Sequence, residues 1–355
     1  MTDWAEPFTA SYRFMRVDHS TMMETERLTS LEQSGSISRN QDTALKESGR
    51  LTAHGPFDIG ADFLRVYLDA EGMYTGWRES VVLGTFLAST SSREVDGPNS
   101  TSSVSLTGLL KIADDDDFDA PVTLQAGEDV VSFCASVLED IGLRVERDES
   151  DFTLSVPWVF GAESGEEGKL DAVNELLDMA GFSSARTDPM GTVQLRRYVD
   201  PSGRSPSHAF AEGRNARFLT TMTDELDTSE VRNVVKAIYS TQNGTVIGVA
   251  EDDDPASPWS TASLGRRIVG VYRYSDDADQ VAADAKAAEL LAGSRSVIRR
   301  VTLEHVIVPG VSIGDVFSAD YPTGSVSGDF AVRTQDIDLG AGCMVTTEGK
   351  RSERL

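Results

Sequence analysis

The segment Leu170-Asp-Ala-Val-Asn-Glu-Leu-Leu-Asp-Met-Ala-Gly-Phe182 interrupts an otherwise β-patterned sequence, and it decides how the chain is organised. Its apolar residues recur at the helical period and form one face: Leu170, Val173, Leu177 and Ala180. Gly181 follows the last of them, and glycine is common where a helix ends in left-handed backbone. The segment is therefore predicted to be a helix that ends at Gly181.

A second helical segment precedes it and ends in the same way. Its apolar face consists of Val130, Cys134, Val137, Leu138 and Ile141. Gly142 lies where a helix-ending glycine is expected. The two endings, Leu138-Glu-Asp-Ile-Gly-Leu143 and Leu177-Asp-Met-Ala-Gly-Phe182, are alike. Residues 118–200 are therefore predicted to form a small α/β domain.

β-patterned sequence lies on both sides of this domain. Short alternating runs separated by clusters of Gly and Ser precede and follow it, and strands at this spacing favour a barrel or a sandwich. The predicted fold is α+β and mainly β, with two β-barrel domains flanking the small α/β domain. The predicted divisions are a first barrel at 1–113, the α/β domain at 118–200, a linker at 201–215, a second barrel at 216–347 and a frayed tail at 348–355.

One helix is predicted inside the second barrel region, at 277–292. Its apolar face would consist of Val281, Ala285, Ala288 and Ala292. We expect this helix to pack against the barrel as a plug or flank. Two polar segments that join strands, Ser89–Asn99 and Ala250–Ser260, are predicted to be long mobile loops.

Composition argues against several classes of protein. The chain has 355 residues and a formal net charge of −26, which repels DNA, RNA and anionic lipid. No apolar run is long enough for a transmembrane helix. Met1–Ala10 lacks the apolar core of a signal peptide, which predicts synthesis and folding in a cytoplasm. The two cysteines, Cys134 and Cys343, are predicted to be buried thiols rather than part of a disulfide framework.

Motifs that carry chemistry are sparse. The phosphate-binding patterns G-x-x-x-x-G-K-[ST] and G-x-G-x-x-G are absent. The histidines lack the spacing of a helical zinc site and a nearby cysteine ligand, which predicts surface or packing roles for His19, His54, His208 and His305. No catalytic, cofactor-binding or metal-binding residue is therefore assigned. A catalytic triad dispersed along the chain stays open, because such residues converge only in space.

Two acidic runs, Asp114–Asp117 and Glu251–Asp254, offer the carboxylates that Ca²⁺ prefers. Neither run fits the twelve-residue calcium loop with its central glycine and terminal glutamate. Adjacent carboxylates also point in different directions, so they seldom converge on one ion. Both runs are predicted to be solvated loop tips.

Three local segments occur in a characteristic order. They are Ala172-Val-Asn-Glu-Leu-Leu-Asp-Met-Ala-Gly-Phe182 followed by Asp188-Pro-Met-Gly191 and Tyr198, then Val231-Arg-Asn-Val-Val-Lys-Ala-Ile-Tyr239, then Pro309-Gly-Val-Ser-Ile-Gly-Asp-Val316. Together with the order of barrel, α/β region, linker and barrel, they resemble the tail hub proteins of tailed bacteriophages. This baseplate-hub family is shared by contractile and long non-contractile tails, and the resemblance covers nearly the whole chain.

The resemblance implies a non-enzymatic structural protein of the virion, assembled in the host cytoplasm and located at the tail tip. It implies a homotrimer whose two barrels per chain form a pseudo-sixfold ring, which adapts a sixfold tube to a threefold tip. The implied partners are further copies of the chain, the distal tail protein, the tape measure protein and tail fibre or receptor-binding proteins. DNA would pass through the ring without specific binding, and carboxylates are expected to dominate the bore. No cofactor and no membrane insertion are implied.

Three other interpretations stay open. The first is another tail, baseplate or secretion-needle subunit, such as a distal tail ring component. The second is a carbohydrate-active enzyme, against which the lack of an acid–base or nucleophile motif argues. The third is a soluble β-rich adhesin, for which a secretion signal would be expected.

Overall fold

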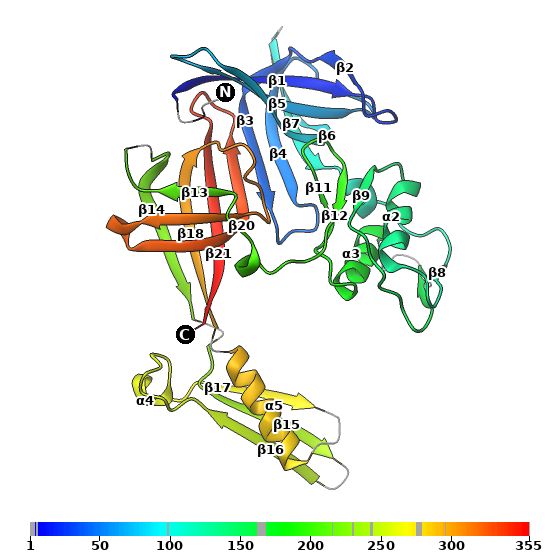
Figure 1. Ribbon diagram of the computed structural model, residues 1–355. Helices are drawn as coiled ribbons and strands as arrows, with labels where there is room; N and C mark the ends of the chain where they lie inside the picture. The colour runs from blue at the N-terminus through cyan, green and yellow to red at the C-terminus, as the bar shows by residue number, and fades with distance from the viewer. Residues whose placement is uncertain are drawn as a thin grey trace. The chain divides into compact units, whose positions relative to one another are not determined.

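A computed structural model describes most of the chain, and it divides into two compact units (Figure 1). The described residues are 4, 6–97, 99–161, 168–214, 216–228, 231–241, 244–274, 279–294 and 296–354. Unit 1 comprises Met1–Thr221 and Leu303–Glu348, and unit 2 comprises Met222–Thr302 and Gly349–Leu355. The division falls within three strands, β14 (Phe218–Asp227), β18 (Ser296–Val306) and β21 (Met344–Arg354).

The N-terminal part of unit 1 is an antiparallel sheet in the order β3-β4-β7-β6-β5-β1-β2. Its strands are β1 (Phe8–Val17), β2 (Glu24–Arg27), β3 (Leu31–Asn40), β4 (Glu47–His54), β5 (Phe63–Gly72), β6 (Arg78–Asp96) and β7 (Asn99–Gly108). Alternate residues point into one core, which contains Phe14, Leu64, Leu68 and Phe86.

The mobile loop predicted over Ser89–Asn99 is wrong. Its residues extend the ladder between β6 and β7, with pairs from Phe86–Gly108 out to Asp96–Asn99. Serine and threonine occur both in solvent-exposed β-strands and in loops. The polar composition of this segment therefore does not distinguish a strand from a loop. Pro98 lies outside the described residues.

The barrel predicted for this region is not confirmed, because the sheet is not closed. No ladder of backbone pairs joins β1 to β3 within the described strands. The side chain of Gln33 takes its place: the backbone N–H of Tyr12 donates to Oε1 at 2.6 Å, and Nε2 donates to the Tyr12 carbonyl at 2.7 Å. The β3 register shifts between Leu31 and Gly35, which turns Gln33 out of the normal pairing.

The next segment packs helices and short strands against the end of this sheet. Its elements are α1 (Lys111–Asp114), β8 (Val122–Leu124), α2 (Val130–Asp140), β9 (Val145–Arg147), β10 (Trp158–Phe160), α3 (Lys169–Met179), β11 (Arg186–Thr187) and β12 (Val193–Leu195). The two predicted helices are confirmed as α2 and α3. Asp129 caps α2 by accepting the Ser132 N–H at 2.6 Å, and Gly142 and Gly181 both have positive φ.

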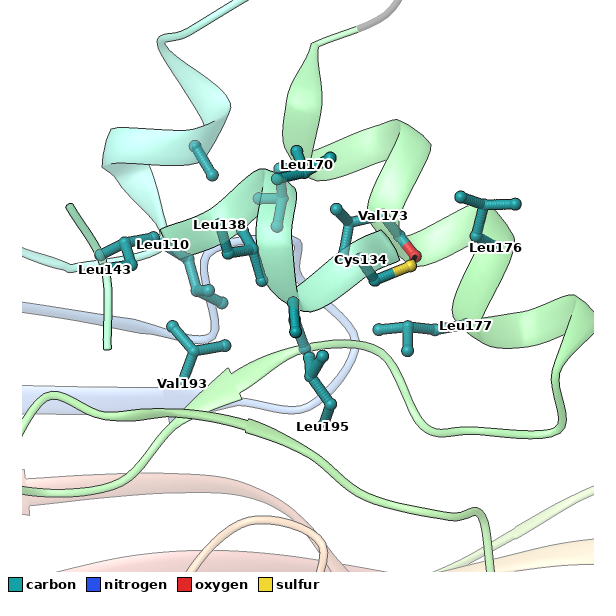
Figure 2. Packing of buried hydrophobic residues seen from close by; sticks show 14 of the residues in the cluster. Leu110, Cys134, Leu138, Leu143, Leu170, Val173, Leu176, Leu177, Val193 and Leu195 are labelled. Carbon is teal, nitrogen blue, oxygen red and sulfur yellow. Dashed lines mark hydrogen bonds between the residues drawn. The ribbon is translucent and has the colours of Figure 1, made fainter. Parts of the chain in front are cut away.

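Helices α2 and α3 lie against each other over a core that reaches the sheet (Figure 2). Cys134 lies between them, and its thiol donates to the Val173 carbonyl at 3.8 Å. Burial raises the pKa of Cys134 to about 12, so the thiol is unreactive at neutral pH. Both cysteines are free and buried, as the sequence predicts. The same core includes Val17 and Leu109, so this segment and the sheet form one unit.

The remaining strands extend the sheet to thirteen strands through the pairing of β20 with β3. The further elements in this part are η1 (Pro201–Gly203), β13 (His208–Ala211), β19 (Val316–Tyr321), η2 (Pro322–Gly324) and β20 (Val326–Asp338). Two predictions are corrected. The linker at 201–215 contains β13, which pairs in parallel with β19, and residue 215 lies outside the described residues. The frayed tail at 348–355 is occupied by β21 as far as Arg354.

Unit 2 contains a separate three-stranded sheet, so residues 216–347 do not form a single barrel. Its elements are β15 (Val234–Thr241), β16 (Gly244–Glu251), β17 (Val269–Tyr274), α4 (Thr261–Leu264) and α5 (Gln280–Gly293). Strand β15 is central, antiparallel to β16 and parallel to β17. Helix α5 packs across one face of this sheet (Figure 1).

The helix predicted at 277–292 is present as α5, although residues 277 and 278 lie outside the described residues. Its predicted apolar face and its predicted packing on a barrel are wrong. The residues that face the small sheet are Ala283, Ala287 and Leu291, whereas Val281 is 77% exposed. Alanine occupies both sides of this helix, so hydrophobic periodicity does not identify the buried side.

Candidate interaction surface

The four histidines do not come together in one site. His54 is exposed beside Glu32, and His19 is exposed beside Asp62. His305 is buried, with Nδ1 2.8 Å from the Val306 carbonyl and Nε2 2.8 Å from the Thr347 hydroxyl. This arrangement fits a neutral ring that donates through Nδ1 and accepts through Nε2. Burial lowers the pKa of His305 to about 4.

We expect His305 to make folding pH-dependent. Because its folded pKa lies below the ordinary value near 6.5, unfolding takes up a proton, and the stabilising effect is full above pH 6.5 and declines as the pH falls toward 4. Between pH 7 and pH 5 the free energy of unfolding should fall by about 2 kcal/mol more in the wild type than in His305→Gln. Chemical denaturation at both pH values measures this, with exposed His54→Gln as control. Equal pH dependence in all three proteins would contradict the assignment.

One group of potential metal ligands forms near the first turn. Ligand atoms of Asp18, His19 and Asp62 lie within 4.8 Å of one another. Asp18 Oδ1, however, accepts the backbone N–H groups of Ser20 and Thr21 at 3.1 and 2.8 Å and both of their hydroxyls. These bonds lower the pKa of Asp18 and make it the cap of a turn. The group therefore has a sufficient explanation without a metal.

Two lysines pair with three carboxylates of the acidic run Asp114–Asp117. Lys111 Nζ lies 2.7 Å from Asp114 and 2.6 Å from Asp115, and Lys169 Nζ lies 2.7 Å from Asp116. Asp117 Oδ1 instead accepts the Phe118 N–H at 2.8 Å, so the four carboxylates do not converge on one ion.

The run Glu251–Asp254 was predicted to be a solvated tip within a mobile loop, and this is wrong for Asp252. Its side chain is 3% exposed and accepts the Ser257 hydroxyl at 2.9 Å, while its carbonyl accepts the Thr261 N–H at 2.8 Å. Asp252 thereby organises the loop that leads to α4.

The segment Gly310-Val-Ser-Ile-Gly314 matches the letters of a G-x-S-x-G nucleophile motif. The structure places it between β18 and β19, and no helix follows it. His305 and Asp315 line the same cavity as Ser312, but both ring nitrogens of His305 are engaged elsewhere. Among the described residues no hydrogen bond joins Ser312 to a histidine, so the geometry does not form a triad.

Charge is divided unequally between the two units. Unit 2 holds 12 of the 32 Lys and Arg residues and 14 of the 58 Asp and Glu residues, a net charge of −2. Unit 1 therefore carries −24 of the total −26. Electrostatic repulsion between two copies of the chain is therefore weakest where they make contact through unit 2.

Unit 2 also exposes an apolar sheet face. Val235, Ala237 and Tyr239 of β15 point toward α5, so their neighbours point to the opposite face. That face carries Ile238, Ile247, Val249, Val269 and Val271, and the last four are each 42–47% exposed. We call these five residues the unit 2 face. Lys236 of β15 lies between Val249 and Val271, so this face is mainly apolar with a basic side chain on its central strand. Exposed apolar residues grouped in this way mark interaction sites more often than single ones do. Sequence periodicity did not identify the group, because its members belong to three strands that pair only in the folded chain.

Comparisons with known proteins give structural similarity without sequence similarity. No protein-family model and no curated protein matches the chain. The tail protein from Neisseria meningitidis MC58 is similar, with a TM-score of 0.61, 15% identity, and 97% of this chain and 96% of that chain covered. The prophage MuSo2 43 kDa tail protein from Shewanella oneidensis has a TM-score of 0.59 and 10% identity, with 96% and 98% covered.

A chain of the Francisella PdpA–VgrG complex is also similar, with a TM-score of 0.60 and 8% identity. The similarity covers 98% of the present chain but only 53% of the Francisella chain, so the present chain spans about half the length of that one. At these identities the likeness establishes the fold. The chain shares, over almost its full length, the fold of two tail proteins, one of them from a prophage, and of a part of the PdpA–VgrG complex. No described helix is long and apolar enough to cross a membrane.

Proposed function

We propose that this chain is a structural, non-enzymatic protein of a bacteriophage tail and forms the hub at the distal end of the tail tube. The observation that carries the proposal is the likeness of this chain, over almost its full length, to two tail proteins.

In the proposed assembly three copies form a ring, adapting a sixfold tube to a threefold tip. Unit 1, at −24, supplies an acidic bore through which DNA slides without binding. The distal tail protein, the tape measure protein and fibre or receptor-binding proteins are the proposed partners. The virion tail tip is the proposed location, after assembly in the host cytoplasm.

We further propose that the unit 2 face contacts a neighbouring copy of the chain. Apolar burial there would favour association, and the near-neutral charge of unit 2 keeps the repulsion between copies small. The proposed partner is a second copy of the chain, because a contact between copies would bury the apolar side chains of this face.

The proposal is tested by electron microscopy and mass photometry of the purified chain, alone and mixed with the neighbouring tail proteins of its genome. The expected result is a ring with threefold symmetry that contains three copies. A ring of six copies, or a chain that stays monomeric with every tail partner, would refute the hub assignment.

The unit 2 face is tested in the same assay with Val271→Asp, which places a carboxylate on this face. We expect the trimer to be lost, whereas Val95→Asp, at a 62% exposed position of β6, should leave the ring intact. If Val271→Asp still forms threefold rings, the contact lies elsewhere and the hub assignment is unaffected.

A further inference from the structure

A small cavity in unit 1 is lined by an unusual number of arginines. It has a volume of about 140 Å³ and lies where residues 183–204 meet the adjoining ends of β3 and β20. The arginines that line it are Arg186, Arg196, Arg197, Arg204 and Arg333. Unit 1 has a net charge of −24, so five guanidinium groups around one cavity depart from the general charge of the unit.

Two of these arginines are held by backbone carbonyls rather than by carboxylates. Arg186 Nη1 donates to the Ile313 carbonyl at 2.9 Å, and Arg204 Nη1 donates to the Gly314 carbonyl at 2.6 Å. These bonds fix the planes of both guanidinium groups without neutralising them. Arg196, in contrast, has carboxylate partners in Glu146 and Asp148 at 3.1 and 3.0 Å.

Asp315 is the acidic side chain whose charge bears on Arg186 and Arg204, and it does not compensate both. Its Oδ2 accepts the Ser312 N–H at 2.8 Å. Burial raises the pKa of Asp315, and the nearby arginines only partly oppose that rise. Arg186 and Arg204, which carry two positive charges, therefore share the one carboxylate of Asp315.

Two buried polar atoms in this cavity lack a hydrogen-bond partner. They are Arg333 Nε, a donor, and Gln41 Oε1, an acceptor, and both residues line the cavity. The Gln41 N–H donates to the Arg333 carbonyl at 2.8 Å, which keeps the two residues side by side. Arg333 also pairs with the exposed Asp42 through Nη2, yet burial still lowers the pKa of Arg333. Buried polar groups are rarely left unpaired, so a donor and an acceptor in one cationic cavity indicate a ligand with both functions.

We propose that this cavity binds inorganic hydrogen phosphate, which keeps a P–OH group at neutral pH. Its oxygens would accept from Arg333 Nε and from the remaining donors of Arg186 and Arg204, and its P–OH would donate to Gln41 Oε1. A water molecule occupies about 30 Å³ of liquid, so the cavity matches the few heavy atoms of one phosphate. Sulfate and phosphodiesters have no proton to donate at neutral pH, so they leave Gln41 unpaired.

Titration calorimetry at pH 7 and matched ionic strength tests the ligand chemistry with inorganic phosphate, sulfate and glycerol 3-phosphate. Phosphate should bind about tenfold or more tightly than sulfate, the difference expected from one hydrogen bond to a charged group. Equal affinity for phosphate and sulfate would overturn the proposal. Glycerol 3-phosphate loses its last proton with a pKa of about 6 and is mostly without a P–OH at pH 7, so it should bind no more tightly than sulfate. Binding of glycerol 3-phosphate as tight as that of inorganic phosphate would overturn the role of Gln41 as acceptor.

The nearly isosteric variant Gln41→Glu tests the location. Its carboxylate would take the place of the ligand between the arginines, so phosphate affinity should fall between about tenfold and a hundredfold while the Tm does not decrease. Gln125→Glu, at an exposed position outside the cavity, adds the same charge and should leave phosphate binding unchanged. An equal loss in both variants, or no loss in Gln41→Glu, would show that phosphate does not bind in this cavity.

Discussion

Phe210→Ala is expected to lower the free energy of unfolding of unit 1 by about 3–5 kcal/mol, the usual cost of removing a buried aromatic ring. Phe210 is 1% exposed on β13. Its ring lies 5.5 Å from that of Phe317 and 4.6 Å from that of His305, measured between centroids. Phe218 and His208 are two further ring neighbours, and the four rings cannot all move inward to fill the space. Chemical denaturation of the purified variant measures the loss.

The matched control is Tyr74→Ala, which removes an aromatic ring that is 80% exposed. It should change the free energy of unfolding by no more than about 0.5 kcal/mol. A loss below about 1 kcal/mol for Phe210→Ala would mean that residues 208–211 behave as the linker that their composition predicts.

Phe210 also illustrates why one part of the fold was not predictable from the sequence. Helices α2 and α3 were found because their apolar period, the cap at Asp129 and the terminal glycines all lie within one short segment. Strand β13 has four residues, and it pairs with β19 more than a hundred residues later. A pairing of that kind leaves no local pattern, so Pro, Gly and Ser in 201–215 were interpreted as a linker.

The proposed phosphate cavity was invisible for the same reason. Its residues come from separate elements, Gln41 after β3, Arg186 on β11 and Arg333 on β20, which pair or pack only in the folded chain. In sequence each is an ordinary polar residue near the end of a strand. Whether the N-terminal sheet closes into a barrel was likewise not predictable. It depends on how β1 and β3 are joined, and here the side chain of Gln33 joins them in place of a backbone ladder.

Gly248 is the position in unit 2 where a side chain has least room. It lies on β16 opposite Ala237, on the face that α5 covers. A Cβ atom at this position would overlap the backbone of Ala283 and Asp284 in α5. Backbone atoms cannot rotate away as a side chain does, so α5 must leave the sheet if Gly248 is replaced by a larger residue. Ala283 and Ala287 on the helix side are small for the same reason, because they allow this close approach.

Gly248→Val is therefore expected to cost unit 2 about 3 kcal/mol or more, at or above the upper end of typical overpacking losses. Hydrogen exchange followed by mass spectrometry should show faster exchange of the β15 and β16 amides and unchanged exchange in α2 and α3, which belong to unit 1. Gly203→Val is the control, since no atom lies within 4 Å of its Cβ position and its φ is not left-handed. Unchanged protection of β15 and β16 in Gly248→Val would mean that α5 does not pack closely on this sheet. Faster exchange in α2 and α3 as well would mean that the two units unfold together. The reason is that the overlap caused at Gly248 is with α5 of unit 2 and not with unit 1.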